Sequence, residues 1–276
     1  MNQFADQCFS NCDDLGKGRQ MPVHYGSRAL NFHTISSPLT TQLPQAAGAA
    51  MAMKQKAKRE GKEVADGVTV VYFGDGAASE GDFHAAMNFA ATLDVPIIFF
   101  CRNNGFAIST PVKEQYRGDG IISRAKGYGM PAIRVDGNDL FAVHSATKAA
   151  KELALEQSRP VLVETMSYRV GHHSTSDDST RYRSVEEIRK WAEEDNPIER
   201  FQRYCESRGW LDEDKVNAIM DEERMAVLQS LESAEKKGPP TLDTLFHDVY
   251  KEKTPELERQ EKELLEHVAK YPDRYS

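Results

Sequence analysis

Short apolar runs alternate with longer segments of helical period between residues 41 and 168. The runs contain β-branched and aromatic residues, which is typical of strands. The predicted strands span residues 68–73, 96–101, 132–135 and 160–168. Apolar spacing of three or four predicts helices at residues 2–15, 41–59, 80–93 and 139–157. Strands that alternate with helices predict an α/β fold, a parallel sheet flanked by helices.

After residue 183 the pattern becomes mainly helical. Ser184 and Glu187 have the spacing of a capping box, in which the hydroxyl accepts from a free amide and the carboxylate reaches back to another. Longer helices are predicted at residues 212–236 and 254–270. The two expected domains are residues 1–183, an α/β domain, and residues 184–276, a helical C-terminal extension.

The composition is ordinary for a globular protein and removes several function classes. The chain has 276 residues, 39% hydrophobic and 28% charged, with a net charge of −8. Nucleic-acid binding needs clustered Lys and Arg, so no such partner is expected. No apolar run approaches the roughly 20 residues of a membrane span, so no membrane partner is expected either. Cys8 and Cys12 lie about one helical turn apart, but no second pair completes a zinc site.

Two polar motifs follow neighbouring predicted strands. Gly-Asp-Gly at residues 74–76 follows the first strand, and Asn103 and Asn104 follow the second. Ligands of parallel sheets bind at the carboxyl ends of strands, where these groups would meet. The Oδ atoms of Asp75 and Asn104 and the carbonyl of Phe106 would supply three oxygen ligands to Mg²⁺, and a diphosphate would supply others.

The backbone after Asp75 suits the same ligand. Gly76 and Ala77 precede the helix predicted at residues 80–93 and would present amides to phosphate oxygens. An Asp-Gly pair alone is also a common turn. The second motif at the next strand end favours the metal–diphosphate interpretation over a simple turn.

Longer stretches around both motifs resemble a known family. Gly-Asp-Gly-Ala-Ala-Ser-Glu-Gly-Asp at residues 74–82 and Phe-Cys-Arg-Asn-Asn-Gly-Phe-Ala-Ile-Ser-Thr-Pro at residues 100–111 are similar to the thiamine-diphosphate motif of α subunits in two-subunit 2-oxoacid dehydrogenase decarboxylases. Residues 18–26, 35–39 and 168–178 resemble the branched-chain type. The last stretch holds His-His-Ser-Thr-Ser-Asp-Asp, where pyruvate-specific relatives have a single His and Ser-Met-Ser-Asp-Pro.

The resemblance implies a thiamine-diphosphate-binding fold that uses Mg²⁺ and K⁺. It implies the same Mg²⁺ ligands, Asp75, Asn104 and the carbonyl of Phe106. The residues implied to contact thiamine diphosphate are Ser37, Leu39, Asp75, Gly76, Ala77, Arg102, Asn104 and His173. The residues implied to hold K⁺ are Ser36, Pro38, Thr41 and Gln42. Without the resemblance, Arg102 is a surface arginine at a strand end and residues 36–42 are a polar turn.

The resemblance also selects His173 as the catalytic residue. The family places it at the diphosphate and in acyl transfer to lipoamide, and a group that titrates near pH ~6.5 suits proton delivery to the dithiolane sulfur. His172 is expected to be structural. A metal site formed by the two histidines with Asp177 and Asp178 is the weaker alternative, because successive residues rarely chelate one ion.

Two serines match regulatory phosphorylation positions of the family. They are Ser174 and Ser184. A phosphate adds about −1.5 to −2 charge, so at Ser174 it would repel the cofactor's diphosphate and disorder the loop. For Ser184 the role of helix cap is sufficient alone.

The implied function is oxidative decarboxylation of branched-chain 2-oxoacids, with acyl transfer to a lipoyl-bearing transacylase. The implied enzyme is of the 3-methyl-2-oxobutanoate dehydrogenase type. A β subunit should complete the site in an α2β2 heterotetramer, with the helical extension making subunit contacts. A regulatory kinase and phosphatase and the mitochondrial matrix are implied as well, although the chain begins with no transit-peptide pattern.

Two alternatives remain at this point. One is a pyruvate dehydrogenase-type α subunit. The other is a truncated, non-catalytic interaction protein, because relatives have an earlier cofactor-contacting segment that nothing in this sequence matches.

Overall fold

A computed structural model describes residues 1–275. The chain forms two compact units, residues 1–37 with residues 213–276, and residues 38–212. Each unit has its own internal packing and is described separately.

The unit of residues 38–212 contains a four-stranded parallel sheet. Its strands are β1 (Thr69–Gly74), β2 (Ile97–Asn103), β5 (Ala132–Asp136) and β6 (Val161–Met166). Their order is β1-β2-β6-β5, and every neighbouring pair is parallel. The predicted α/β class and its four strands are confirmed. Most strand ends differ from the predicted ones by one or two residues.

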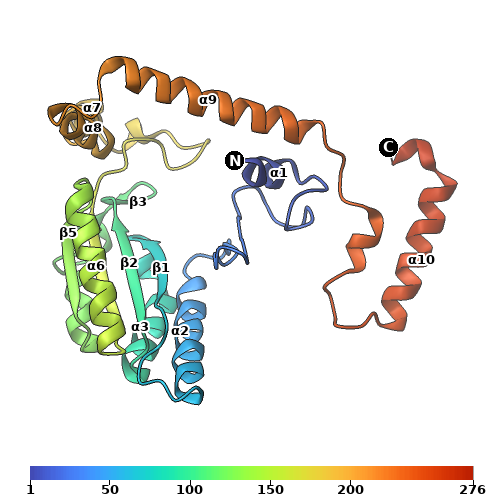
Figure 1. Ribbon diagram of the computed structural model, residues 1–276, viewed down its shortest axis with the longest axis horizontal. Coiled ribbons are helices and arrows are strands. Elements are labelled where there is room, and N and C mark those ends of the chain that lie inside the picture. Colours follow the sequence, from blue (N-terminus) through green and yellow to red (C-terminus); the bar gives the residue numbers. More distant parts are fainter. Residues whose placement is uncertain (276) are drawn as a thin grey trace. The chain divides into compact units, whose positions relative to one another are not determined.

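Helices cover both faces of this sheet (Figure 1). The longer ones are α2 (Gln42–Arg59), α3 (Gly81–Leu93) and α6 (Leu140–Glu156). Helices α2 and α3 pack against each other and share one hydrophobic cluster with the sheet, whereas α6 packs on β5 and β6 in a second cluster. A sheet buried on both faces explains why its strands read as continuous apolar runs.

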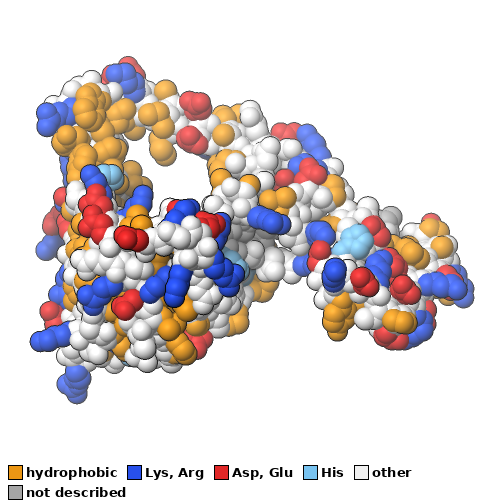
Figure 2. All heavy atoms as spheres, turned by 60° about the horizontal axis from the view of Figure 1, so that its bottom comes forward, with side chains coloured by type: hydrophobic (Ala, Val, Ile, Leu, Met, Phe, Trp, Pro, Cys, Tyr) orange, Lys and Arg blue, Asp and Glu red, His pale blue; other side chains and the backbone are white. Residues whose placement is uncertain are grey.

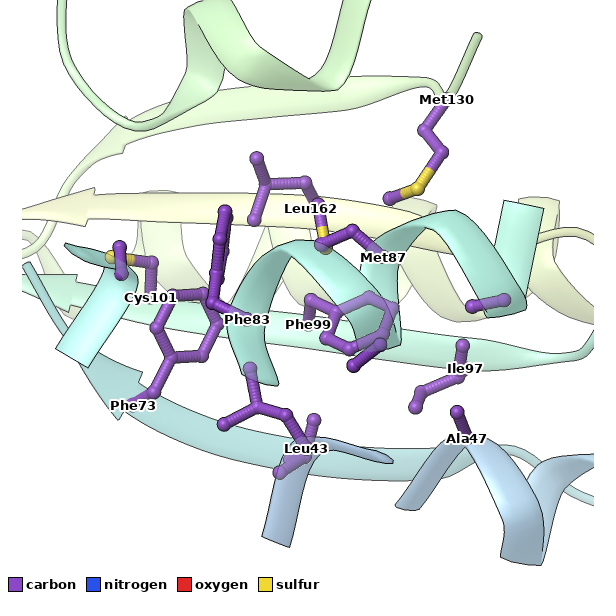
Figure 3. Packing of buried hydrophobic residues seen from close by; sticks show 14 of the residues in the cluster. Leu43, Ala47, Phe73, Phe83, Met87, Ile97, Phe99, Cys101, Met130 and Leu162 are labelled. Atoms are coloured by element: carbon purple, nitrogen blue, oxygen red, sulfur yellow. The ribbon is translucent and has the colours of Figure 1, made fainter. Parts of the chain in front are cut away.

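Strand alternation divides the buried side chains between the two clusters. Phe73, Phe99 and Leu162 point toward α3 in the larger cluster (Figure 3). Ile98 and Val163 belong to the cluster on the α6 side. Successive side chains of a strand point to opposite faces, so each central strand contributes to both cores.

The loop predicted at residues 103–120 contains short elements of its own. They are β3 (Phe106–Ala107), β4 (Thr110–Pro111) and α4 (Val112–Gln115), and α5 (Ile122–Ala125) follows. Strands β3 and β4 form a small antiparallel hairpin beside the carboxyl edge of the main sheet.

The boundary expected after residue 183 does not coincide with the compact units. Helices α7 (Val185–Glu194) and α8 (Pro197–Ser207) belong to the same unit as the sheet. The Trp191 ring stacks on Tyr168 with 5.0 Å between centroids, and Arg200 Nη1 lies 2.9 Å from Asp136 Oδ2. Aromatic and ionic contacts therefore hold these helices to the carboxyl ends of β5 and β6.

The other unit consists of chain segments from both ends of the sequence. Its helices are α1 (Asn2–Phe9), α9 (Glu213–Glu235) and α10 (Pro255–Lys270). Helix α1 packs on α9, and Asn11 Nδ2 donates to the carbonyl of Ala234 at 3.1 Å. The helix predicted at residues 2–15 ends earlier, because Ser10 is left-handed (φ 51°) and caps it.

Basic and acidic side chains are interspersed on the face shown in Figure 2. Among the described residues, no helix combines the length and the apolar character needed to cross a membrane.

Candidate metal and diphosphate site

The register of β1 and β2 brings the two polar motifs together. Gly74 pairs with Arg102, so Asp75 and Asn103 follow at the same edge of the sheet. Asp75 is only 1% exposed. Its Oδ1 accepts from the backbone amide of Asn104 at 3.2 Å, and its Oδ2 accepts from Gln115 Nε2 at 2.8 Å. The predicted juxtaposition of Asp75 with the asparagine turn is present.

The backbone after Asp75 is closely packed. A Cβ atom on Gly76 would lie 2.7 Å from Ala107 Cβ, so only glycine fits there. Ala77 begins a 3₁₀ turn, η1 (Ala77–Ser79), and α3 starts only at Gly81. Gly76 and Ala77 therefore lie on a tight turn between strand and helix.

Asn104 and Phe106 lie on the turn between β2 and β3. Asn104 Oδ1 accepts from the Phe106 amide at 3.1 Å, and Gly105 between them has a left-handed φ of 88°. Phe106 is paired with Pro111 in the hairpin. Because proline has no N–H, this partner does not engage the carbonyl of Phe106.

The surroundings of Asp75 fit a divalent cation. A buried carboxylate is costly unless an opposite charge compensates it, yet both hydrogen-bond donors to Asp75 are neutral amides. Within the described chain, no ion pair involves Asp75, and no group of three or more His, Cys, Asp or Glu side chains is arranged to hold a metal ion. A cation here would need amide and carbonyl oxygens, which Asn104 and Phe106 supply.

Arg102 lies at the end of β2 with an exposed side chain. Over residues 1–275 its guanidinium forms no hydrogen bond or ion pair. It is therefore available to an anionic group at this edge, where it could donate in a bidentate manner.

The two adjacent histidines have different surroundings. His172 Nδ1 accepts from the backbone amide of Ser179 at 3.1 Å and lies 3.0 Å from its hydroxyl, which places His172 within the loop structure. His173 is exposed; its backbone amide donates to Asp177 Oδ2 at 2.8 Å, while its ring forms no hydrogen bond in the described part of the chain. The imidazole of His173 is free to act on a ligand.

A set of hydrogen bonds gives this loop its shape. Arg183 donates to the carbonyls of Arg169, Val170 and Gly171. Tyr182 OH donates to Asp177 Oδ2 at 2.7 Å. The amide of His173 and the hydroxyl of Tyr182 hold the pKa of Asp177 below its usual range.

The same loop is tied to the turn that carries two predicted Mg²⁺ ligands. The Arg169 guanidinium lies 5.8 Å from the Phe106 ring centroid, and its Nη2 donates to the carbonyl of Ile108 at 2.6 Å. The backbone amide of Arg169 donates to the carbonyl of Asn104 at 3.4 Å. The segment that carries His173 is thus connected directly to Asn104 and Phe106.

The segment predicted to hold K⁺ and the pyrimidine divides between the units. Ser36 and Ser37 lie at the end of residues 1–37, in the unit that also contains residues 213–276. Ser37 Oγ lies 2.5 Å from His24 Nε2. Pro38, Leu39, Thr41 and Gln42 begin the second, where Leu39 is exposed and Thr41 Oγ1 donates to the Pro38 carbonyl at 3.0 Å.

Two buried oxygens in this segment lack a partner. Within residues 1–275, Gln42 Oε1 accepts no hydrogen bond, and Thr40 Oγ1 neither donates nor accepts one. An oxygen of this kind suits a hard cation such as K⁺. Gln42 is one of the residues predicted to hold K⁺, and that role stays a prediction; the sequence did not single out Thr40.

A cavity of about 660 Å³ adjoins the site at the carboxyl ends of β5 and β6. Its lining includes Phe106, Pro111, Arg134, Met166, Tyr168 and Trp191. Of the predicted Mg²⁺ ligands only Phe106 belongs to this lining.

Two further residues that the sequence did not single out, Gln115 and Glu164, contact the motif residues themselves. A carboxylate within an apolar strand is a feature of the sequence that could have identified Glu164, whereas no such feature marks Gln115.

The fold and this edge define a class of protein. A parallel sheet flanked by helices, with an acidic turn and an asparagine turn at adjacent strand ends, is an arrangement that suits a metal ion and an anionic ligand at the carboxyl edge of the sheet. Residues 1–243 match the family described as "Dehydrogenase E1 component". The chain belongs to this family.

Curated relatives are similar over the whole chain. The chain is 56% identical over 276 residues to a protein of Dictyostelium discoideum named "2-oxoisovalerate dehydrogenase subunit alpha, mitochondrial". It is 57% identical over 275 residues to the Caenorhabditis elegans protein of the same name and 55% identical over 272 residues to the human one. The matches cover 99–100% of this chain but 60–62% of the relatives.

Proposed function

We propose that this chain is the α subunit, or part of it, of a branched-chain 2-oxoacid dehydrogenase. The reaction is the oxidative decarboxylation of a 2-oxoacid such as 2-oxoisovalerate, with transfer of the acyl group to lipoamide. The observation that carries the proposal is the edge formed by Asp75, Asn104 and Phe106, in a chain at least 55% identical to the three named relatives.

The chain's residues have definite roles toward Mg²⁺ and thiamine diphosphate. Asp75 Oδ, Asn104 Oδ and the Phe106 carbonyl would hold Mg²⁺, since all three are oxygen donors at one sheet edge. The backbone of Gly76 and Ala77 and the guanidinium of Arg102 would bind the diphosphate. The bound cofactor would supply a nucleophilic carbon for the 2-oxo group and an electron sink after CO₂ leaves.

Two other groups extend the cofactor site. Ser37 and Leu39 would contact the pyrimidine and the central part of the cofactor. His24 is positioned to orient Ser37, because its Nδ1 lies 3.0 Å from the Pro22 carbonyl and its Nε2 faces the serine hydroxyl. In the tautomer that donates from Nδ1, Nε2 accepts a hydrogen bond from the serine hydroxyl.

His173 is the proposed catalytic residue. Its ring is exposed and free while its backbone is held by Asp177, so the imidazole can approach the diphosphate without the loop losing its shape. A group of this kind can deliver a proton at Nε2 or Nδ1 to the lipoyl sulfur during acyl transfer.

K⁺ would stabilise the segment that precedes α2. The proposed ligands are Ser36, Pro38, Thr41 and Gln42, and the unpartnered Oε1 of Gln42 supports an oxygen-rich site. Removal of K⁺ is expected to lower cofactor affinity rather than the rate of the chemical step, because these residues lie next to the cofactor-contacting Ser37 and Leu39.

Regulation would act through Ser174 and Ser184. Ser174 is exposed beside His173, and its Oγ lies 3.4 Å from Ser176 Oγ. A phosphate there would bring a second negative charge close to Asp177 and weaken the loop that Asp177 holds. A kinase and a phosphatase are the proposed partners for this switch.

The proposed assembly is an α2β2 heterotetramer that delivers its product to a lipoyl-bearing transacylase. The helices after residue 183 would make part of the subunit contacts. The relatives are named as mitochondrial proteins, and the mitochondrial matrix is the proposed location.

The function is tested by mixing the chain with β subunit, Mg²⁺, K⁺ and thiamine diphosphate. CO₂ release from 2-oxoisovalerate should exceed release from pyruvate. A preference for pyruvate would favour the pyruvate-type alternative. Tight association with the β subunit, without CO₂ release or Mg²⁺-dependent cofactor binding, would favour the non-catalytic interaction protein.

Asp75→Asn tests the metal assignment in the same assembly. The change keeps the shape but removes the charge that Mg²⁺ needs, so Mg²⁺-dependent cofactor affinity should fall by more than about 10-fold, the usual minimum for residues that only support a metal ligand. Calorimetry measures the affinity. The matched control is Asp94→Asn, an exposed aspartate that follows the last residue of α3, which should leave affinity unchanged.

A further inference from the structure

We propose that Glu164 is a positioning residue for the Mg²⁺-binding turn. It is a buried carboxylate on β6 that fixes the orientation of the Asn103 amide and, through it, the placement of Asn104 and Phe106. The inference deepens the proposed function and rests on it for the identity of the ligand, but the positioning itself can be measured without a ligand.

Glu164 accepts four hydrogen bonds although its side chain is 0% exposed. Its Oε1 accepts from Asn103 Nδ2 at 2.9 Å and from the Ile121 amide at 2.8 Å. Its Oε2 accepts from the Ile122 amide at 3.0 Å and from Arg134 Nε at 3.2 Å. Donors therefore engage both oxygens, and one donor carries the compensating charge.

A carboxylate can only accept, and this property fixes the Asn103 amide. Its nitrogen must face Glu164, so its oxygen must point the other way. Asn103 Oδ1 accepts from the amide of Gly105 at 3.2 Å. Asn103 is 2% exposed, so water does not offer an alternative partner in either orientation.

The Gly105 amide connects the orientation of the Asn103 side chain to the proposed metal site. Gly105 is the left-handed residue between Asn104 and Phe106. On one side of it the Asn104 amide donates to Asp75 Oδ1, and on the other the Phe106 amide donates to Asn104 Oδ1. A displaced Gly105 would move two of the three proposed Mg²⁺ ligands away from Asp75.

Ordinary core packing does not require a carboxylate at residue 164. Its neighbours on β6 are the buried Val163 and Thr165, and a charge placed there is costly unless it is fully paired. The four donors come from β2, β5 and the turn at residues 121–122, so the group connects three segments around the proposed site.

The test compares Glu164→Gln with the unchanged chain. Glutamine has one acceptor oxygen, so its NH₂ group must replace either Oε1, which faces Asn103 Nδ2 and the Ile121 amide, or Oε2, which faces the Ile122 amide and Arg134 Nε. The oxygen should face the charged guanidinium of Arg134, because charge-assisted hydrogen bonds are the stronger ones, and the NH₂ group then opposes the Asn103 amide. Hydrogen–deuterium exchange at residues 103–107 of the chain without cofactor should become at least about 10-fold faster. In the assembly with β subunit, the dissociation constant for Mg²⁺ should rise about 10- to 100-fold, as for other residues that orient metal ligands.

Two further variants separate positioning from general stability. Asp119→Asn removes the charge of an exposed partner of Arg134, whose Nη1 lies 3.0 Å from Asp119 Oδ1, and should change neither measurement. Asn103→Asp combined with Glu164→Gln reverses donor and acceptor between the two side chains, while the carboxylate introduced at residue 103 can still accept from Gly105. This double variant should recover part of the slow exchange, which a purely structural role would not predict.

The proposal is overturned if Glu164→Gln lowers only the melting temperature and leaves exchange at residues 103–107 unchanged. It is also overturned if the double variant exchanges as fast as Glu164→Gln. Should Glu164→Gln not fold, Glu164→Asp keeps the charge toward Arg134 but shortens the reach to Asn103 and provides the same comparison. If the unchanged assembly binds no cofactor, the proposed function fails while exchange still decides the role of Glu164.

Discussion

Gly76 shows how a single missing methyl group permits the site. Its position lies directly after the buried Asp75, and a Cβ there would approach Ala107 Cβ to 2.7 Å. The hairpin of β3 and β4 can therefore lie against the turn that follows β1. The φ of Gly76 is −62°, so the residue is glycine because another chain segment approaches closely, and not because the backbone is left-handed.

Gly76→Ala should destabilise the protein by about 1–3 kcal/mol, the usual cost of overpacking. Denaturant unfolding measures the loss. Gly81→Ala is the matched control, since nothing lies within 4 Å of a Cβ there and alanine favours the first turn of α3. Equal stability of the two variants would contradict the packing explanation.

At the scale of elements, α7 begins with a cap that the sequence predicted only in part. Ser184 Oγ accepts from the Glu187 amide at 3.1 Å, as expected. The Glu187 carboxylate instead accepts from Tyr168 OH at 2.9 Å. One half of the capping box is present, and the other half has become a contact between α7 and the segment after β6.

Ser184→Ala should cost about 1 kcal/mol, whereas Ser184→Gly should cost only a few tenths, because glycine leaves the cap exposed to water. Thermal unfolding compares the two variants. If alanine and glycine are equally tolerated, Ser184 does not act as a cap. A phosphate on Ser184 would remain near the helix N-terminus, which favours negative charge.

A second element-scale contact joins α1 to the end of α9. Asp6 is buried, and its Oδ1 lies 2.8 Å from Lys237 Nζ. Burial alone would raise the pKa of Asp6, but hydrogen bonds from Lys237 and Asn11 and the Lys237 charge outweigh it and lower the pKa. A lowered folded pKa adds stability above the ordinary pKa of aspartate, about 3.9, which is lost as pH falls through the folded value.

Asp6→Asn should therefore reduce stability at neutral pH and flatten its decline in acid. Unfolding measured by circular dichroism between pH ~2 and ~7 tests both effects. Asp221→Asn, at an exposed position on α9, serves as the control and should keep the decline of the unchanged chain. An unaltered pH profile for Asp6→Asn would rule out this contribution.

At the scale of the whole molecule, the hydrophobic cores lie in one unit. Both clusters of buried apolar residues fall entirely within residues 38–212. The other unit joins chain segments that are more than 170 residues apart in sequence and has few buried apolar side chains.

Residues 38–212 should therefore fold when expressed alone, with a cooperative thermal transition, because they contain the complete sheet and both cores. Residues 213–276 alone should show no cooperative transition. Calorimetry of the two fragments is the measurement. If the fragment of residues 38–212 does not unfold cooperatively, the remaining residues, 1–37 and 213–276, contribute stability that the sheet requires.

The sequence predicted the elements well because their signals are local. Apolar runs and helical periodicity depend on residues within a few positions, and strands such as residues 68–73 and 96–101 could be placed to within one or two residues. The motif at residues 74–76 and the asparagine pair also follow their strands directly, so their shared edge could be inferred from parallel pairing. The end of α1 at Phe9 was missed because a left-handed Ser10 leaves no clear pattern.

The tertiary structure alone decided which distant groups act on the site. Glu164 reaches Asn103 from 61 positions away, and Gln115 reaches Asp75 from 40, distances over which no local pattern operates. The same holds for α7 and α8, which read as an extension in the sequence but pack with the sheet. By itself the sequence determined the class of fold and the residues of the proposed metal–diphosphate motif. Packing determined their orientation, because a buried amide can point only where its neighbours leave an acceptor or a donor.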